Sequence, residues 1–213
     1  VVSDRLGDLD ASLTDSHGLF HSDTRYLSRF RLTVNEVSPT VLSVDDSAHY
    51  AAQFFLVQPT GSVIDDSQLA VLRRRSIDLG FREEITVLSH SRQPMDVDLQ
   101  IEVAADCADL FEVKEHLDKL GTCYEDIRDG GLLLGYRRGG FCRETLITTS
   151  DQSCTLTPKS LRFAINLPPR GEWSVTVDVA VASDMLGDTR TSRRYGGARE
   201  TRRGRPRESM HVP

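Results

Sequence analysis

The strongest constraint on the fold of this chain is an alternation of apolar and polar side chains, with a period of two residues, that recurs along most of its length. Phe30, Leu32 and Val34, for example, form one apolar face of a short run. This period is typical of a β-strand that buries one face, because successive side chains of a strand point to opposite sides. The runs predict about ten strands, at residues 30–34, 40–44, 50–57, 69–77, 81–89, 97–104, 132–137, 144–149, 161–167 and 173–181.

Helical periodicity is confined to one stretch, residues 108–120. Its apolar residues recur at spacings of three and four, at Leu110, Val113, Leu117 and Leu120. This spacing predicts one short helical segment. The links between the predicted strands are short and rich in turn-forming residues, with Asp-Gly-Gly at 129–131 as the best hairpin signal. The sequence therefore predicts an all-β fold, a large antiparallel β-sandwich.

Three consecutive arginines weaken the alternation in the run at residues 69–77. Arg73, Arg74 and Arg75 follow one another there. An arginine carries a long apolar stem that can lie along a surface while the charged end stays in water. We therefore expect one face of this strand to be lined by arginine stems that lie on a neighbouring surface.

Composition divides the chain into a folded part and a tail. With 213 residues, of which 38% are hydrophobic and 27% charged, the chain fits one large β domain. From residue 187 onward the alternation stops, and Arg, Gly, Ser, Thr and Pro dominate. Such a segment buries too little apolar surface to offset its ordering entropy. We predict a β-sandwich domain at residues 1–186 and a disordered, Arg-rich tail at 187–213.

The charge distribution and the lack of long apolar runs argue against nucleic acid and membranes as partners. Residues 188–213 carry eight arginines against three acidic residues, a charge of +5, so residues 1–187 of a chain with net charge −6 carry −11. Because an acidic body repels the phosphate backbone of nucleic acid, only the tail could bind it. We therefore do not expect nucleic acid as a partner. No apolar run approaches the roughly 20 residues that a membrane helix needs, and residues 1–10 carry charges where a signal peptide would need an apolar stretch. We expect a cytoplasmic protein without membrane contact.

The sequence offers no pattern typical of a metal or cofactor site. Cys107, Cys123, Cys142 and Cys154 lack the spacing of metal ligands, and we expect buried, reduced thiols. No nucleophile elbow and no glycine-rich phosphate loop is recognised. We therefore expect no cofactor and no metal.

A polar cluster precedes the first clear strand. Asp23, Thr24 and Arg25 are consecutive, and an Asp two residues before an Arg lies on the same side of an extended segment. The two side chains could form a structural ion pair, face another domain, or contact a sugar. We favour the structural role.

A second acidic cluster invites comparison with glycosidases, which use two carboxylates. Asp106, Asp109 and Glu112 would share one face of a helical turn. Carboxylates are also favoured at the start of any helix, so we favour a structural role and predict no catalytic residue. Aromatic rings that could stack on sugars are present at Tyr50, Tyr124, Tyr136 and Trp173. Trp173 alternates with Val175 and Val177, which predicts packing between sheets rather than sugar binding.

Several segments, in the same order, resemble the N-terminal domain of bacterial glycogen debranching enzymes of the amylo-alpha-1,6-glucosidase family. Residues 18–28 resemble its G-x-F-x-x-D-T-R-x-L-S motif, residues 2–8 its V-S-D-x-x-G-D opening, residues 32–35 its L-T-V-N segment, residues 73–75 its R-x-R strand, and residues 105–113 its D-F-A-D-x-F-E-V motif. The similarity covers about residues 1–181, and the order of the motifs is more specific than any one of them.

The resemblance implies a supersandwich-like, non-catalytic accessory domain that supports α-glucan processing. In this family the hydrolytic carboxylates are expected in a separate (α/α) barrel domain, and the barrel or an α-glucan is the expected partner. Because no barrel follows here, we expect a truncated gene product. Phe111 then joins the acidic and polar clusters as a structural or domain-interface candidate. The alternative is a stand-alone carbohydrate-binding module for α-glucans.

Overall fold

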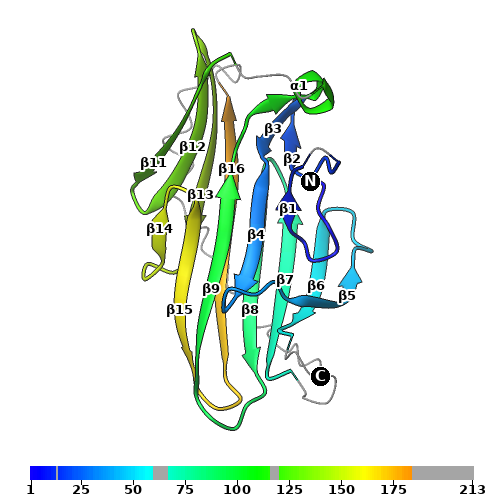
Figure 1. The fold of residues 1–213 in the computed structure, drawn as a ribbon, viewed down its shortest axis with the longest axis vertical. Helices are drawn as coiled ribbons and strands as arrows, with labels where there is room; N and C mark the ends of the chain where they lie inside the picture. Colours follow the sequence, from blue (N-terminus) through cyan, green and yellow to red (C-terminus); the bar gives the residue numbers. More distant parts are fainter. Residues whose placement is uncertain (13, 60–66, 116–119, 184–213) are drawn as a thin grey trace, which may run out of the picture.

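The computed structural model describes residues 1–12, 14–59, 67–115 and 120–183. It shows an elongated body in which two layers of β-strands pack face to face, with one short helix at one end (Figure 1). The predicted all-β, antiparallel fold with one short helical segment is confirmed. The tail predicted at residues 187–213 lies outside the described residues.

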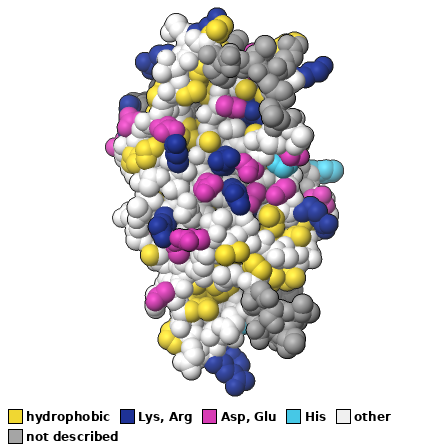
Figure 2. Space-filling model, in the orientation of Figure 1, with side chains coloured by type: hydrophobic (Ala, Val, Ile, Leu, Met, Phe, Trp, Pro, Cys, Tyr) yellow, Lys and Arg dark blue, Asp and Glu magenta, His cyan; other side chains and the backbone are white. Residues whose placement is uncertain are grey.

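One layer is a five-stranded antiparallel sheet. Its strands, in spatial order, are β1 (Leu9–Asp10), β4 (Arg29–Val34), β9 (Met95–Ala104), β15 (Ser160–Leu167) and β14 (Thr155–Thr157). Its outward side chains are polar and paired, as Arg162 with Asp98 and Arg29 with Asp10 illustrate. Figure 2 shows charged side chains of both signs over the middle of this face.

The other layer is an eight-stranded antiparallel sheet. Its strands, in spatial order, are β11 (Thr122–Arg128), β12 (Gly131–Arg138), β13 (Phe141–Thr149), β16 (Glu172–Ser183), β8 (Phe81–Ser89), β7 (Leu69–Ile77), β6 (Ala51–Val57) and β5 (Thr40–Asp45). The inward positions of both layers alternate with outward ones and build a common core. Trp173 on β16 packs against Phe163 on β15, with ring centroids 5.4 Å apart, so its predicted role between the sheets is confirmed.

A three-stranded sheet closes one end of the sandwich. It consists of β2 (Leu19–His21), β3 (Thr24–Leu27) and β10 (Ala108–Asp109), and β10 leads directly into the helix α1 (Leu110–Glu115). The hydroxyl of Thr145 on β13 donates a hydrogen bond to the carbonyl oxygen of Tyr26 at 2.6 Å, which ties this sheet to the eight-stranded layer. Within the described part of the chain, no helix has the length and apolar character needed to cross a membrane.

The structure corrects the sequence analysis where alternation is missing. The strands β7 and β8 have the predicted bounds, and the other eight predicted strands differ by three residues or fewer at either end. The strand β11 was not predicted, because it is an edge strand with most side chains exposed on both faces. The strands β1, β2, β3, β10 and β14 have only two to four residues, which is too short to show a period.

Two further expectations need correction. The helix predicted at residues 108–120 begins only at Leu110, because residues 108–109 pair with β3 instead, and residues 116–119 lie outside the description. The four cysteines are free thiols, but they are not uniformly buried. Cys107 is buried, whereas Cys123 is exposed because it lies on the edge strand β11.

The turn between β7 and β8 approaches β16 closely at Gly80. A Cβ atom added to Gly80 would lie 1.9 Å from the carbonyl oxygen of Val179, which is backbone and has little room to move. A Cβ atom added to Gly140, in the turn between β12 and β13, would meet nothing within 4 Å. Neither glycine has a positive φ, so the two positions differ in the room available for a side chain and not in a need for the left-handed backbone conformation.

We expect Gly80→Ala to lower the free energy of unfolding by at least about 1–3 kcal/mol, because the backbone must shift to accommodate the methyl group. Gly140→Ala is the matched control and should change it by less than about 0.5 kcal/mol. Urea denaturation followed by tryptophan fluorescence measures both. Equal stability of the two variants would contradict the close approach of the turn to β16.

Candidate functional site

The residues singled out from the sequence gather at the end of the sandwich that carries α1 (Figure 1). We call this region, formed by β2, β3, β10 and α1, the α1 corner. The candidates there are Asp23, Thr24, Arg25, Asp106, Asp109, Phe111 and Glu112. The structure therefore brings together residues from two motifs that are about 80 positions apart in the chain.

Arg25 pairs with Asp106. The Nε atom of Arg25 donates hydrogen bonds to both carboxylate oxygens of Asp106 at 3.1 Å, and its Nη2 atom bonds the same carboxylate. The side chain of Arg25 is only 10% exposed, so this fork-like contact is largely shielded from water. Asp106 also accepts a hydrogen bond from the backbone N–H of Ala108 at 3.2 Å. The pair thus fixes the start of β10 against β3.

The partner of Arg25 is Asp106 rather than Asp23, so the ion pair suggested by the sequence spacing is not formed. Ser22 and Asp23 have φ angles of 45° and 58°, so they form the tight turn between β2 and β3. Asp23 is therefore not in an extended segment, and its exposed side chain does not share a face with Arg25. Its carbonyl oxygen instead accepts a hydrogen bond from the backbone N–H of Leu110 at 3.1 Å, which holds the first residue of α1.

Asp109 and Glu112 cap the helix reciprocally. The backbone N–H of Glu112 donates to Oδ1 of Asp109 at 2.8 Å, and the backbone N–H of Asp109 donates to Oε2 of Glu112 at 2.9 Å. This arrangement is a capping box. The expectation that Asp106, Asp109 and Glu112 share one helical face is wrong, because Asp106 precedes β10 and lies outside the helix. Each of the three carboxylates has a structural contact.

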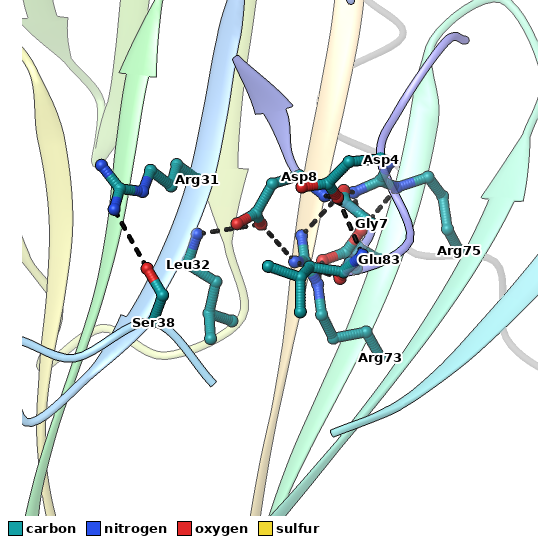
Figure 3. Close-up of polar contacts among 10 residues, drawn as sticks. Asp4, Gly7, Asp8, Arg31, Leu32, Ser38, Arg73, Arg75 and Glu83 are labelled. Carbon is teal, nitrogen blue, oxygen red and sulfur yellow. Dashed lines mark hydrogen bonds and ion pairs between the residues drawn. The ribbon is translucent and has the colours of Figure 1, made fainter. Parts of the chain in front are cut away.

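A second concentration of charge lies between the two sheets and was not predicted (Figure 3). Glu83 on β8 accepts hydrogen bonds from Nε of Arg73 at 2.7 Å and from Nε of Arg75 at 2.5 Å. Arg73 also donates through Nη1 to Oδ1 of Asp8 at 2.5 Å. Arg73 and Glu83 are 0% exposed, and Arg75 and Asp8 are 3% exposed. We call these four residues the ionic cluster.

The ionic cluster holds the N-terminal loop in the core. The carbonyl oxygen of Gly7 accepts hydrogen bonds from Arg73 at 3.2 Å and from Arg75 at 2.7 Å. Within the loop, Oδ1 of Asp4 accepts from the backbone N–H groups of Leu6 and Asp8, both at 2.8 Å. Gly7 has a φ of 82° and lies against the ring of Phe54, where a Cβ atom would be 2.8 Å from a ring carbon. Only glycine fits this turn without strain.

Two of the three arginines line one face of β7, as expected, but their charged ends are buried between the sheets and do not stay in water. Arg73 and Arg75 take inward positions on β7, whereas Arg74 points outward and is 51% exposed at its side chain. The guanidinium of Arg75 lies among aromatic rings, 4.6 Å from the ring centroid of Phe81 and 5.6 Å from that of Phe30. Cation–π attraction supplements the ion pairs there. A sequence signal was available, since Glu83 stands at an apolar position of the next strand.

The pKa values in the ionic cluster follow from burial and charge. Burial alone raises the pKa of Glu83, but the two guanidinium groups outweigh it and hold this pKa below the ordinary 4.5. Burial raises the pKa of Asp8 above the ordinary 3.8, despite the neighbouring Arg73. Every carboxylate in the cluster is engaged by arginine, so the cluster is suited to holding the fold together rather than to transferring protons.

A third polar group lies on the outward face of the eight-stranded sheet. The hydroxyl of Tyr124 donates to Oε1 of Glu144 at 2.5 Å and lies 3.3 Å from Sγ of Cys142. The tyrosine ring crosses over Gly135, where a Cβ atom would be 2.2 Å from the ring. The guanidinium of Arg137 lies 5.6 Å from the ring centroid. Burial and the hydrogen bonds to Cys142 and Glu144 raise the pKa of Tyr124.

Potential metal ligands do not cluster in the described part of the chain. No group of three or more His, Cys, Asp or Glu side chains there is placed to hold a metal ion. His17, which precedes β2, approaches the carbonyl oxygen of Asp10 at 3.2 Å through Nδ1.

A protein-family model matches residues 1–178 of the chain, and it describes the N-terminal domain of some glycogen debranching enzymes. The chain belongs to this family. The resemblance seen in the motifs is thus confirmed for the debranching-enzyme N-terminal domain. A comparison with curated proteins gave no match.

Solved structures that match the chain include the following three, each with low sequence identity and a TM-score below 0.5. A chain described as a kojibiose phosphorylase from the human microbiome is 14% identical, with a TM-score of 0.48 over 84% of this chain and 26% of that one. A polysaccharide lyase is 13% identical, with a TM-score of 0.38 over 73% of this chain and 25% of that one. A galactose mutarotase-like protein from Clostridium acetobutylicum is 8% identical, with a TM-score of 0.33 over 78% of this chain and 77% of that one. This chain thus spans about a quarter of the length of each of the first two proteins.

We expect Glu83→Gln to lower the free energy of unfolding by about 3–5 kcal/mol, because it leaves two buried guanidinium groups with too little negative charge. Glu84→Gln is the matched control on the next position of β8. Glu84 is 48% exposed at its side chain and lies 3.7 Å from Arg74, so its loss should cost less than about 1 kcal/mol. Urea denaturation of both variants at neutral pH makes the comparison, and similar values would contradict a buried cluster.

Acid should weaken the ionic cluster through Glu83. Because the pKa of Glu83 in the folded chain is lowered, its ion pairs contribute fully above pH 4.5, and this contribution is lost as the pH falls through the folded-state pKa. The raised pKa of Asp8 has the opposite effect on the pH dependence of stability. Its contribution to the free energy of unfolding is complete below pH 3.8 and is lost as the pH rises through the folded-state pKa. Carboxyl-carbon NMR titration should give a midpoint below 4.5 for Glu83 and above 3.8 for Asp8. A Glu83 midpoint above 4.5 would show that burial outweighs the two arginines.

Proposed function

We propose that this chain is a non-catalytic accessory domain that supports α-glucan processing by a separate catalytic domain of a debranching enzyme. The family match over residues 1–178 supports the context, since it describes the N-terminal part of such enzymes. A domain of this kind contributes shape and contacts, and the catalytic domain contributes the acid and the base.

The observation that carries the proposal is the way in which the domain uses its carboxylates. Asp8 and Glu83 are enclosed with arginines, Asp106 is held by Arg25, and Asp109 and Glu112 cap a helix. A glycosidase needs one carboxylic acid free to donate a proton and one carboxylate that faces the same sugar. The carboxylates that the sequence suggested for catalysis are committed to structural contacts instead.

A stand-alone carbohydrate-binding module is the second candidate. The observation that favours it is the group formed by Tyr124, Arg137 and Glu144 on the outward face of the sheet, since an aromatic ring flanked by polar groups suits a sugar. Electrophoresis through a gel that contains glycogen separates the two functions. An accessory domain should migrate unretarded, whereas a binding module should be retarded in the wild type and released by Tyr124→Ala.

We expect the purified 213-residue chain to release no glucose from glycogen limit dextrin, and to raise the debranching rate of a catalytic domain that lacks its own N-terminal domain when the two are mixed. Glucose measured with a coupled oxidase assay gives both results, with an intact debranching enzyme as the positive control. Glucose release by the chain alone, lost on Asp106→Asn or Glu112→Gln, would overturn the proposal. A rate unchanged by the added chain would also contradict it.

A further inference from the structure

An apolar patch lies on the outward face of the eight-stranded sheet, over β6, β7 and β8. Phe55 on β6 is 39% exposed and lies directly opposite Leu72 on β7. Leu88 on β8 lies opposite Ala70, which is the neighbour of Leu72 on the same face of β7. Leu72 and Leu88 are both partly exposed. Because direct and diagonal neighbours on one face of a sheet reach one another, these four residues form one surface, which we call the outer patch.

The outward positions beside the outer patch are polar and already paired. The hydroxyl groups of Thr86 and Ser174 lie 2.9 Å apart, within hydrogen-bonding distance. Arg74 lies 3.7 Å from the carboxylate of Glu84. An apolar surface with a polar rim is typical of a contact between proteins.

The outer patch continues into a groove at the end of the sandwich opposite α1. The groove has a volume of about 530 Å³ and is lined by Leu88, Ser89, His90, Arg170, Gly171 and Glu172. Glu172 on β16 lies directly opposite Leu88, so the groove and the outer patch share this leucine. Figure 1 shows the turn between β15 and β16, which carries one wall of the groove, at the end of the molecule far from α1.

Two opposite charges in this groove lack partners within their own domain. Arg170 and Glu172 are both exposed, and in the part of the chain that the structure describes neither side chain forms an ion pair or a hydrogen bond. The backbone that carries them is nevertheless fixed. The N–H of Arg170 donates to the carbonyl oxygen of Ser91, and the N–H of Gly171 donates to that of Pro168, both at 2.9 Å.

A surface with one free cation and one free anion side by side is complementary to a copy of itself. In a two-fold contact the same patch is used by both copies, so Arg170 of one copy can pair with Glu172 of the other while the reverse pair also forms. Two bodies that each carry a charge of −11 over residues 1–187 repel one another. A face whose free charges are balanced lowers this repulsion.

We propose that the outer patch and the adjoining groove form an interface between two copies of this chain, with Arg170 of each copy paired with Glu172 of the other. The outer patch supplies the apolar centre of the contact, and the two crossed ion pairs fix its register. This inference goes beyond the accessory function proposed above and does not depend on it.

Sedimentation equilibrium of the full 213-residue chain measures the dimer Kd. Phe55→Ser should weaken the dimer by about 10-fold or more, because it removes the aromatic side chain of the outer patch. Phe111→Ser is the matched control, since Phe111 is 72% exposed but lies on α1, at the other end of the molecule. It should leave the dimer Kd unchanged.

Charge reversal tests the crossed ion pairs. Arg170→Glu alone and Glu172→Arg alone each place like charges opposite one another, and each should weaken the dimer by about 10-fold or more. An equimolar mixture of the two single variants should associate nearly as tightly as the wild type, because one variant carries two acids at these positions and the other carries two bases. A role of these residues within one copy does not produce this rescue.

Each outcome either supports the interface or overturns it. A wild-type chain that remains monomeric overturns it, as does a dimer that Phe55→Ser does not weaken. A mixture of the two charge variants that fails to associate contradicts the crossed pairs. Binding of a monomeric wild-type chain to an isolated debranching catalytic domain, lost in Phe55→Ser, would assign the outer patch to that domain and overturn the second copy as its occupant. Circular dichroism of each variant confirms that a loss of association is not a loss of fold.

Discussion

The buried contact of Glu83 with Arg73 and Arg75 is the interaction on which the rest of the structure depends. Removing these charges from water is costly, and close ion pairs and hydrogen bonds offset the cost. The partners come from β7, β8 and the N-terminal loop, because Asp8 and the carbonyl oxygen of Gly7 also accept hydrogen bonds from the arginines. The loop is therefore part of the core, although it has almost no regular secondary structure.

The N-terminal segment also connects this core to the α1 corner. Val2 and Gly18 exchange two backbone hydrogen bonds, both of 2.9 Å, so the residues just before the ionic cluster lie beside the start of β2. Gly18 in turn lies against Arg25, where a Cβ atom would be 2.6 Å from Cδ of the arginine. Two motifs that are separate in the sequence thus form one continuous piece of structure, which runs from the ionic cluster to the helix.

The sequence was sufficient for the fold class because alternation reports burial directly. The strands β7 and β8 were predicted with correct bounds, since apolar residues fill most of their inward positions. The same rule missed the ionic cluster on these strands, because its inward residues are charged. Arg73, Arg75 and Glu83 occupy such positions, and an average hydrophobic pattern treats them as surface residues. Their opposite signs on consecutive strands were the available clue, but sequence alone does not show that two charges face each other across a ladder.

For the site, the sequence grouped the right residues but not their contacts. Arg25 and Asp106 are 81 positions apart, so local spacing offered Asp23 as the nearer partner, and the positive φ of Asp23 removed it. Once these pairs are assigned, the acidic residues suggested for catalysis are engaged in holding the domain together. Phe111 is different, because the fold positions it firmly and gains little from its burial. Its position reflects the capping of the helix that carries it by Asp109 and Glu112 and not packing of its own ring.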